Sequence, residues 1–140
     1  MYRSETKIRV RYGETDQMGY VYYGNYAMYY EVARVESLRQ LGLSYKELED
    51  GGVMMPVLEN KSRFLAPALY DDELRIVTTI REKPSVRINF EYEIYNGSNV
   101  LINQGETRLA FVSKGTGKPC RPPEHFQNVL KPFFNEARHT

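Results

Sequence analysis

The chain contains one long helix-forming segment, and almost everything that follows it alternates in the manner of β-strands. Asn25 is a suitable N-cap for this helix, and Gly42 is a typical stop. The apolar residues between them scatter around most of the helix circumference, which predicts a helix that is buried on most sides. These residues are Tyr26, Met28, Tyr29, Tyr30, Val32, Ala33, Val35, Leu38 and Leu41. A sheet wrapped around the helix would bury it in this way.

Five other segments are predicted to be strands, and residues 7–12, 74–80 and 86–94 among them alternate with the period of a strand. The five segments span residues 7–12, 53–65, 74–80, 86–94 and 100–112. Pro56 is predicted to bend the second segment, and Asn96-Gly97-Ser98 is a hairpin signal between the last two. Short helices are predicted over residues 44–49 and 124–134. Because only one long helix is present to cover a five-stranded antiparallel sheet, the sequence predicts a single α+β domain over residues 1–140, with the sheet wrapped around one central helix.

Composition argues against several classes of function. The formal net charge of +1 gives no electrostatic reason to expect nucleic acid or membrane as a partner. A single cysteine, Cys120, cannot form an internal disulfide and fits a reducing cytoplasm. His125 and His139 are the only histidines, and their spacing from Cys120 predicts no metal site. No apolar run approaches the ~20 residues of a membrane helix, so we expect a cytoplasmic protein that uses no cofactor.

A long loop with three glycines, residues 13–24, directly precedes the helix and contains the candidate catalytic residue Asp16. A carboxylate that faces a helix N-terminus places a nucleophile or base opposite backbone N–H donors and the positive end of the helix dipole. This arrangement can attack a carbonyl without serine, cysteine or a metal. The alternative is that Asp16 is only a turn residue in Thr-Asp-Gln-Met-Gly. Glu14, the other acid of the loop, is interpreted as solvated or structural.

The stretch at residues 11–26, RYGETDQMGYVYYGNY, resembles the hotdog-fold acyl-CoA thioesterases of the 4-hydroxybenzoyl-CoA thioesterase-like family. The segments YEVARVE at residues 30–36 and FLAPALYDD at residues 64–72 are also typical of that family, and the similarity covers roughly residues 5–125. The resemblance implies a hotdog fold, thioester hydrolysis, and a homodimer or homotetramer with each site between two subunits. It assigns the acid that acts on the thioester to Asp16. It assigns the helix-start amide that polarises the carbonyl to Tyr23 or its neighbour.

Some members of this family carry histidine at the position of Tyr23. Its absence here removes one candidate proton shuttle, so Asp16 has to do more of the acid–base work alone. A hotdog-fold dehydratase is disfavoured, because no histidine lies in the loop or at the helix start.

The predicted substrate-binding residues fall into two groups. Near the loop they are Gly19, Tyr22, Gly24, Asn25 and Tyr26, where the two glycines let the backbone approach a ligand. The second group is Lys83, Ser85, Arg87, Lys114 and Lys118, which the hairpin at Asn96-Gly97 brings to one end of the sheet. There they can hold the phosphates of coenzyme A, or simply form a solvated basic end. The tyrosines at positions 20–30 can stack on an aromatic acyl group or serve as packing.

Several alternatives remain open from the sequence. Asp16 can attack the carbonyl and form a mixed anhydride, or activate a water molecule as a general base. The substrate can be a short-chain or aromatic acyl-CoA, or an acyl group on an acyl carrier protein. A non-catalytic module that binds acyl-CoA is a third reading. Glu31 or Glu36 on the helix can supply a second carboxylate, although a structural or paired role is favoured.

Overall fold

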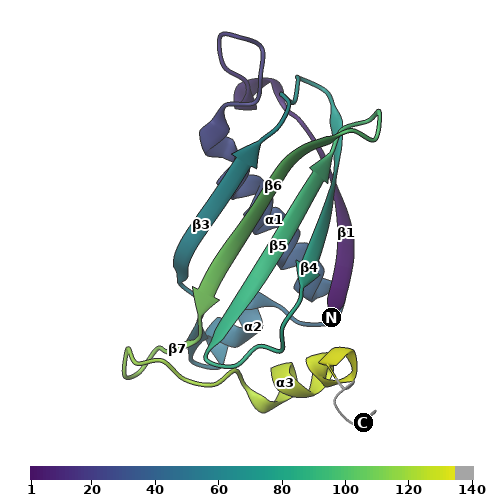
Figure 1. Ribbon diagram of the computed structural model, residues 1–140. Helices are drawn as coiled ribbons and strands as arrows, with labels where there is room; N and C mark the ends of the chain where they lie inside the picture. The colour runs from purple at the N-terminus through teal and green to yellow at the C-terminus, as the bar shows by residue number, and fades with distance from the viewer. Residues whose placement is uncertain (135–140) are drawn as a thin grey trace.

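The computed structural model describes residues 1–134, and these form one five-stranded antiparallel sheet with a long helix across one face (Figure 1). The strands of this sheet are β1 (Tyr2–Arg9), β3 (Val57–Phe64), β4 (Glu73–Ile80), β5 (Arg87–Tyr95) and β6 (Leu101–Ala110), in the spatial order β1-β4-β5-β6-β3. The helices are α1 (Tyr26–Arg39), α2 (Tyr45–Asp50) and α3 (Glu124–Leu130). Two short strands, β2 (Val53–Met54) and β7 (Val112–Ser113), pair separately. The predicted α+β architecture is confirmed.

The ends of the elements follow from local chemistry, with two corrections to the expected boundaries. Pro56 interrupts the predicted strand over residues 53–65 and separates β2 from β3. The terminal helix over residues 124–134 is α3 followed by a 3₁₀ turn, Lys131–Phe134. The first strand was predicted over residues 7–12 but spans Tyr2–Arg9. The alternation was missed there because one inward position is Ser4, whose hydroxyl donates to that of Ser37 on α1 at 2.8 Å.

Helix α1 ends as predicted but begins differently. Gly42 has a φ of +81°, its N–H donates to the Arg39 carbonyl at 2.9 Å, and the Leu43 N–H donates to the Leu38 carbonyl at 3.0 Å. These two bonds are the Schellman arrangement that glycine permits. Asn25 does not act as a side-chain N-cap, because its backbone is already helical and its amide donates to the Glu14 carbonyl at 2.8 Å.

The prediction that α1 is buried on most sides is wrong for the single chain. The buried positions recur every three or four residues and make one stripe: Tyr26, Tyr29, Tyr30, Ala33, Arg34, Ser37 and Leu38. The sheet covers only this stripe. Met28 and Val32 point away from it and are 39% and 40% exposed. The chain therefore leaves an apolar strip of its central helix uncovered.

The core between α1 and the sheet contains an unusually close contact at Gly105 of β6. The ring of Tyr30 lies parallel to that of Tyr92, with 4.3 Å between the centroids, and both side chains are almost fully buried. The Tyr30 hydroxyl donates to the Asn103 side chain and shares a hydrogen bond with Ser62. A Cβ atom added at Gly105 would approach the hydroxyl and ring of Tyr30 more closely than 3.0 Å. Glycine is therefore required where this phenol meets the strand.

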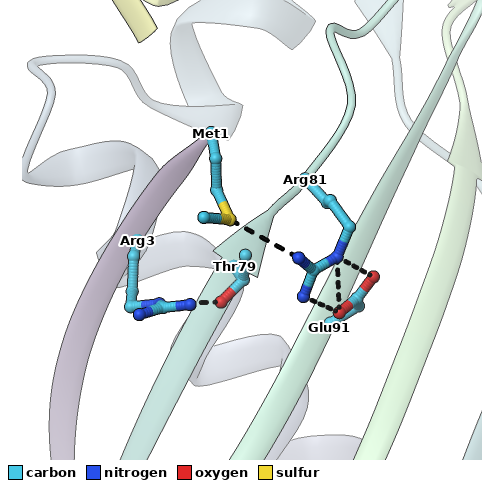
Figure 2. Close-up of polar contacts among 5 residues, drawn as sticks. All are labelled: Met1, Arg3, Thr79, Arg81 and Glu91. Atoms are coloured by element: carbon cyan, nitrogen blue, oxygen red, sulfur yellow. Dashed lines mark hydrogen bonds and ion pairs between the residues drawn. The ribbon is translucent and has the colours of Figure 1, made fainter. Parts of the chain in front are cut away.

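The other face of the sheet is polar and carries cross-strand pairs. Figure 2 shows Arg81, just after β4, donating to both carboxylate oxygens of Glu91 on β5, with the shortest bond at 2.9 Å. Beside it, Arg3 of β1 donates to the Thr79 hydroxyl at 3.5 Å. Such exposed pairs contribute little to stability. They mark this face as one that water can cover, in contrast to the apolar face that carries α1.

Strand β3 is the exposed edge of the sheet. It pairs only with β6, and all eight of its residues are exposed. Val57, Leu58 and Phe64 are each 50% or 51% exposed. A strand edge with open backbone groups is a template for pairing with another strand.

Among residues 1–134, no helix has the length and apolar character needed to cross a bilayer. The same residues contain no group of three potential metal-ligating side chains, and His139 lies outside the described part of the chain.

Candidate active site

Asp16 occupies a tight turn at the end of the sheet where β3 finishes (Figure 1). Its Oδ1 accepts hydrogen bonds from the Met18 N–H at 2.9 Å and the Tyr20 N–H at 3.2 Å. The backbone closes the same turn, since the Asp16 N–H donates to the Tyr20 carbonyl at 2.8 Å. Gly19 has a φ of +81°, a conformation that favours glycine. One carboxylate oxygen thus fixes the turn, while Oδ2 accepts no hydrogen bond from the described residues.

The Asp16 side chain lines a groove of about 350 Å³. Three segments form its walls: the loop, the start of α1, and the end of β3 with the turn that follows. The lining residues are Asp16, Met18, Tyr20, Val21, Tyr23, Tyr26, Phe64, Leu65, Ala66 and Pro67. This is the small end of the range for ligand sites, which runs from about 300 to 1,000 Å³. The groove has room for a small ligand or for one end of a larger one.

The wall from Phe64 to Pro67 is the part of the site that sequence reasoning missed. Phe64 contacts Tyr26 edge-on, with ring centroids 5.2 Å apart, and Tyr23 at 6.4 Å. In the sequence, residues 64–72 contributed to the family resemblance, but nothing in their spacing linked them to Asp16. Their proximity is a tertiary effect of β3 ending beside α1.

Of the predicted tyrosines, Tyr26 and Tyr23 line the groove and Tyr22 does not. Tyr26 is 3% exposed, and burial raises its pKa to about 12, so its phenol stays protonated at neutral pH. The Tyr22 ring lies against the Tyr23 ring at 4.8 Å and is 48% exposed. A Cβ at Gly24 would lie 2.7 Å from the Tyr22 ring, so a larger residue there would displace this half-exposed ring.

The start of the helix presents backbone donors beside the groove. Residues Tyr23–Asn25 form a 3₁₀ turn that runs directly into α1. The first N–H groups of a helix lack intrahelical partners and carry the positive end of its dipole. The amides of Tyr23 and Gly24 therefore belong to a region suited to binding a negatively charged oxygen.

Glu14 is structural, in agreement with one of its two interpretations. It is 7% exposed, and its carboxylate accepts hydrogen bonds from Arg11 and from the Tyr29 hydroxyl. Burial opposes its charge, but the Arg11 backbone bond, the Tyr29 bond and the Arg11 guanidinium together hold its pKa below the ordinary value. Glu36 pairs with Arg39 at 2.6 Å on the surface, and neither Glu31 nor Glu36 lines the groove.

The predicted basic group lies at the opposite end of the sheet from Asp16 (Figure 1). The Phe111 N–H donates to the Val86 carbonyl, and the Ser113 N–H donates to the Lys118 carbonyl, so the two segments do meet. The members of the group, all exposed, are Lys83, Ser85, Arg87, Lys114 and Lys118. An eight-residue strand spans roughly 26 Å at about 3.3 Å per residue. Within one chain these residues are therefore far from the groove.

A sequence profile described as the thioesterase-like superfamily matches residues 10–130. The chain belongs to this superfamily. Two curated relatives are each 34% identical to it: YneP of Bacillus subtilis, which carries a provisional name as an acyl-CoA thioesterase, and the acyl-CoA thioester hydrolase YbgC of Escherichia coli. The alignments cover 86% of this chain and 88% of YneP, and 84% of this chain and 87% of YbgC.

The crystal structure of a DHNA-CoA thioesterase from Staphylococcus aureus superposes with a TM-score of 0.83 at 32% identity. The match covers 99% of this chain and 88% of that one. The predicted hotdog fold and the predicted thioester hydrolase are thereby confirmed. The superfamily match includes the loop, the helix and the Phe64–Pro67 wall, so every segment that lines the groove lies inside it.

Proposed function

We propose that this thioesterase hydrolyses a short-chain or aromatic acyl-CoA to the free acid and coenzyme A, with Asp16 acting on the thioester carbonyl. The observation that carries the proposal is that the Asp16 carboxylate and the start of α1 line one groove. The related proteins support acyl-CoA as the substrate class, because they are named for that activity.

In the general-base route, Asp16 removes a proton from water, and the resulting hydroxide adds to the thioester carbonyl. The tetrahedral oxyanion is then held by the N–H groups of Tyr23 and Gly24. Its collapse expels the coenzyme A thiolate, which takes up a proton. Removal of one oxyanion-hole donor costs roughly 2.7–4 kcal/mol of transition-state stabilisation in measured cases. The reaction as proposed needs no metal or cofactor, because carboxylate and amides supply both functions.

In the nucleophilic route, Asp16 Oδ2 itself adds to the carbonyl and the thiolate leaves, so that a mixed anhydride forms. Water then hydrolyses the anhydride and regenerates the carboxylate. Both routes need an oxygen that is not committed to the turn, and Oδ2 accepts no hydrogen bond from residues 1–134. The aromatic wall of Tyr23, Tyr26 and Phe64 supports an aromatic acyl group as well as a short aliphatic one.

The site is proposed to be shared between two copies of the chain, as a homodimer or a dimer of dimers. The fully exposed edge of β3 and the uncovered Met28 and Val32 on α1 both favour a partner. A two-fold axis would pair β3 with its copy in antiparallel fashion. The basic end of one sheet then comes beside the groove end of the other. In this arrangement Lys83, Ser85, Arg87, Lys114 and Lys118 serve the nucleotide phosphates of coenzyme A bound in the partner's groove.

The direct test is release of free thiol from a panel of short-chain, branched and aromatic acyl-CoA esters, with the same acyl groups on acyl carrier protein. We expect turnover of at least one acyl-CoA ester and weaker turnover of the carrier-protein esters. Turnover confined to carrier-protein esters would mean that the basic end of the sheet binds the acidic surface of the carrier protein. If the purified, folded protein turned over no ester of either kind, a binding role without hydrolysis would replace this proposal.

A mixing experiment tests the shared site. Asp16→Asn should abolish turnover, and Lys114→Glu with Lys118→Glu should raise KM for acyl-CoA by about tenfold, as loss of roughly 1.4 kcal/mol of phosphate binding predicts. After the two variants exchange subunits, a mixed dimer has one site with both defects and one with neither. Activity at low substrate should therefore exceed the sum of the separate variants and reach about a quarter of wild type.

The charge-matched control for this mixture is Lys7→Glu with Lys46→Glu, two exposed lysines on β1 and α2. This control should keep the wild-type KM. The contrary result is a mixture whose activity only equals the sum of the activities of the two separate variants, although subunit exchange has been demonstrated. The basic residues and Asp16 of each site would then lie in the same subunit, or would share no site.

A further inference from the structure

Glu14 joins the beginning of the loop to the body of α1 through its side chain. Its Oε1 accepts hydrogen bonds from the Arg11 N–H at 2.9 Å and from the Tyr29 hydroxyl at 2.8 Å. Its Oε2 accepts from Arg11 Nε at 2.9 Å and pairs with the guanidinium at 2.8 Å. Tyr29 is 2% exposed, so this contact reaches the buried face of the helix.

The main chain of Glu14 binds the other end of the loop. Its carbonyl accepts hydrogen bonds from the Tyr22 N–H at 2.9 Å and from the Asn25 side-chain amide at 2.8 Å. One residue therefore fixes three points: the loop entry at Arg11, the loop exit at Tyr22, and the helix start at Asn25. A buried carboxylate that accepts three hydrogen bonds and forms an ion pair is held rigidly.

The two groups proposed to act on the thioester lie between these fixed points, close to them in the chain. Asp16 follows Glu14 by two residues, and Tyr23, a proposed oxyanion donor, follows Tyr22 by one. The hydrogen bonds of Glu14 thus determine the distance between the Asp16 carboxylate and the helix-start amides. Catalysis of acyl transfer depends steeply on such distances, since a misplacement of about 1 Å can reduce the rate by about 10²-fold.

We infer that Glu14 is a positioning residue, which holds the Asp16 turn against the start of α1 so that the carboxylate and the amide donors meet the same carbonyl. This role rests on the proposed function of Asp16. Glu14 does not line the groove. It acts through its hydrogen bonds to Arg11, Tyr22, Asn25 and Tyr29, and does not contact the substrate.

Protonation chemistry fits the role. The pKa of Glu14 is held below its ordinary value, and burial together with the Glu14 carboxylate raises the pKa of Tyr29. At neutral pH the pair is a carboxylate acceptor and a phenol donor. Because the folded-state pKa of Glu14 is lowered, its stabilisation is complete above the ordinary glutamate pKa and is lost as pH falls through the folded value. The titratable groups that face it are the Arg11 guanidinium, which is charged, and the Tyr29 phenol, which is neutral.

Glu14→Gln tests the inference, because glutamine keeps the size of the side chain but has one accepting oxygen in place of two and no charge to pair with Arg11. We expect kcat to fall by about 10²-fold with KM changed by less than threefold. The Tyr22 and Asn25 N–H groups donate to the Glu14 and Tyr22 carbonyls. Amide hydrogen exchange at these two positions should accelerate, which reports the loosened loop without any activity measurement. The stability difference between wild type and this variant should shrink as pH falls below the ordinary glutamate range.

Two further variants keep the test decisive. Tyr29→Phe removes one donor only and should give a smaller fall in kcat, so it replaces Glu14→Gln if that variant does not fold. Tyr2→Phe is the control, because it removes another buried phenol hydrogen bond, to the Ser37 carbonyl at the far end of α1. It should lose about as much stability as Tyr29→Phe but leave kcat unchanged. Wild-type kcat in Glu14→Gln, with Asp16→Asn inactive, would overturn the inference while leaving the proposed function intact. Full activity in both variants would instead overturn the proposed function.

Discussion

Replacing Asp16 with asparagine should reduce kcat by about 10²–10⁴-fold, the range that removal of a general base produces. Asparagine retains an oxygen at the Oδ1 position, so the hydrogen bonds from the Met18 and Tyr20 amides remain and the turn should stay closed. What is lost is the second, uncommitted carboxylate oxygen. KM should change little, because the groove walls are untouched. The measurement is thiol release from the best ester of the panel, under saturating substrate, with the fold checked by circular dichroism.

The matched control is Asp72→Asn, a second aspartate that closes a turn by accepting a hydrogen bond, here from the Leu69 N–H at 2.8 Å. It does not line the groove and should keep kcat within about twofold of wild type. Unchanged kcat in Asp16→Asn would remove Asp16 from the mechanism and return it to the simpler role of a turn residue. Equal losses in both variants would show that turn geometry, not the carboxylate, limits the reaction.

The elements that sequence predicted well are those governed by local chemistry. Gly42 stopped α1 because only glycine readily adopts the φ of +81° that the Schellman turn needs. Pro56 marked the position of the break correctly, although a bend in one strand was predicted and two strands, β2 and β3, are found, because proline cannot donate to the ladder. Asp16 and Gly19 could be placed in one tight turn from their spacing alone. In each case the decisive interaction joins residues fewer than six positions apart.

The features that sequence could not supply depend on partners far along the chain. The Phe64–Pro67 wall reaches the Asp16 groove only because β3 ends beside the start of α1. Glu14 left two interpretations open because its buried partner, Tyr29, is 15 residues away. The apolar circumference of α1 predicted burial on most sides, yet the sheet covers one stripe and leaves Met28 and Val32 exposed. Hydropathy alone does not distinguish burial inside one chain from burial between two.

Replacing Gly105 with alanine should be the most destabilising single-methyl change in the described part of the chain, at about 1–3 kcal/mol of unfolding free energy. The new Cβ would overlap the Tyr30 hydroxyl and ring, closer than the 3.0 Å that real Cβ atoms respect. Tyr30 has no room to withdraw, because it is fully buried and stacked on Tyr92 at 4.3 Å. A shift would also break its hydrogen bonds to Asn103 and Ser62. Urea unfolding of wild type and variant measures the difference.

Gly97→Ala is the matched control, since a Cβ there meets nothing within 4 Å and its φ is not in the left-handed region. Its stability should stay within about 0.5 kcal/mol of wild type.

A double-mutant cycle then identifies the cause of the destabilisation. In a Tyr30→Ala background the stability cost of Gly105→Ala should fall by more than about 0.5 kcal/mol, because the obstructing ring is gone. An undiminished cost in that background would mean that the β6 backbone, and not the tyrosine, demands glycine. A smaller cost in that background would instead establish that the Tyr30 phenol, which reaches Ser62 on β3, determines which residue can occupy position 105.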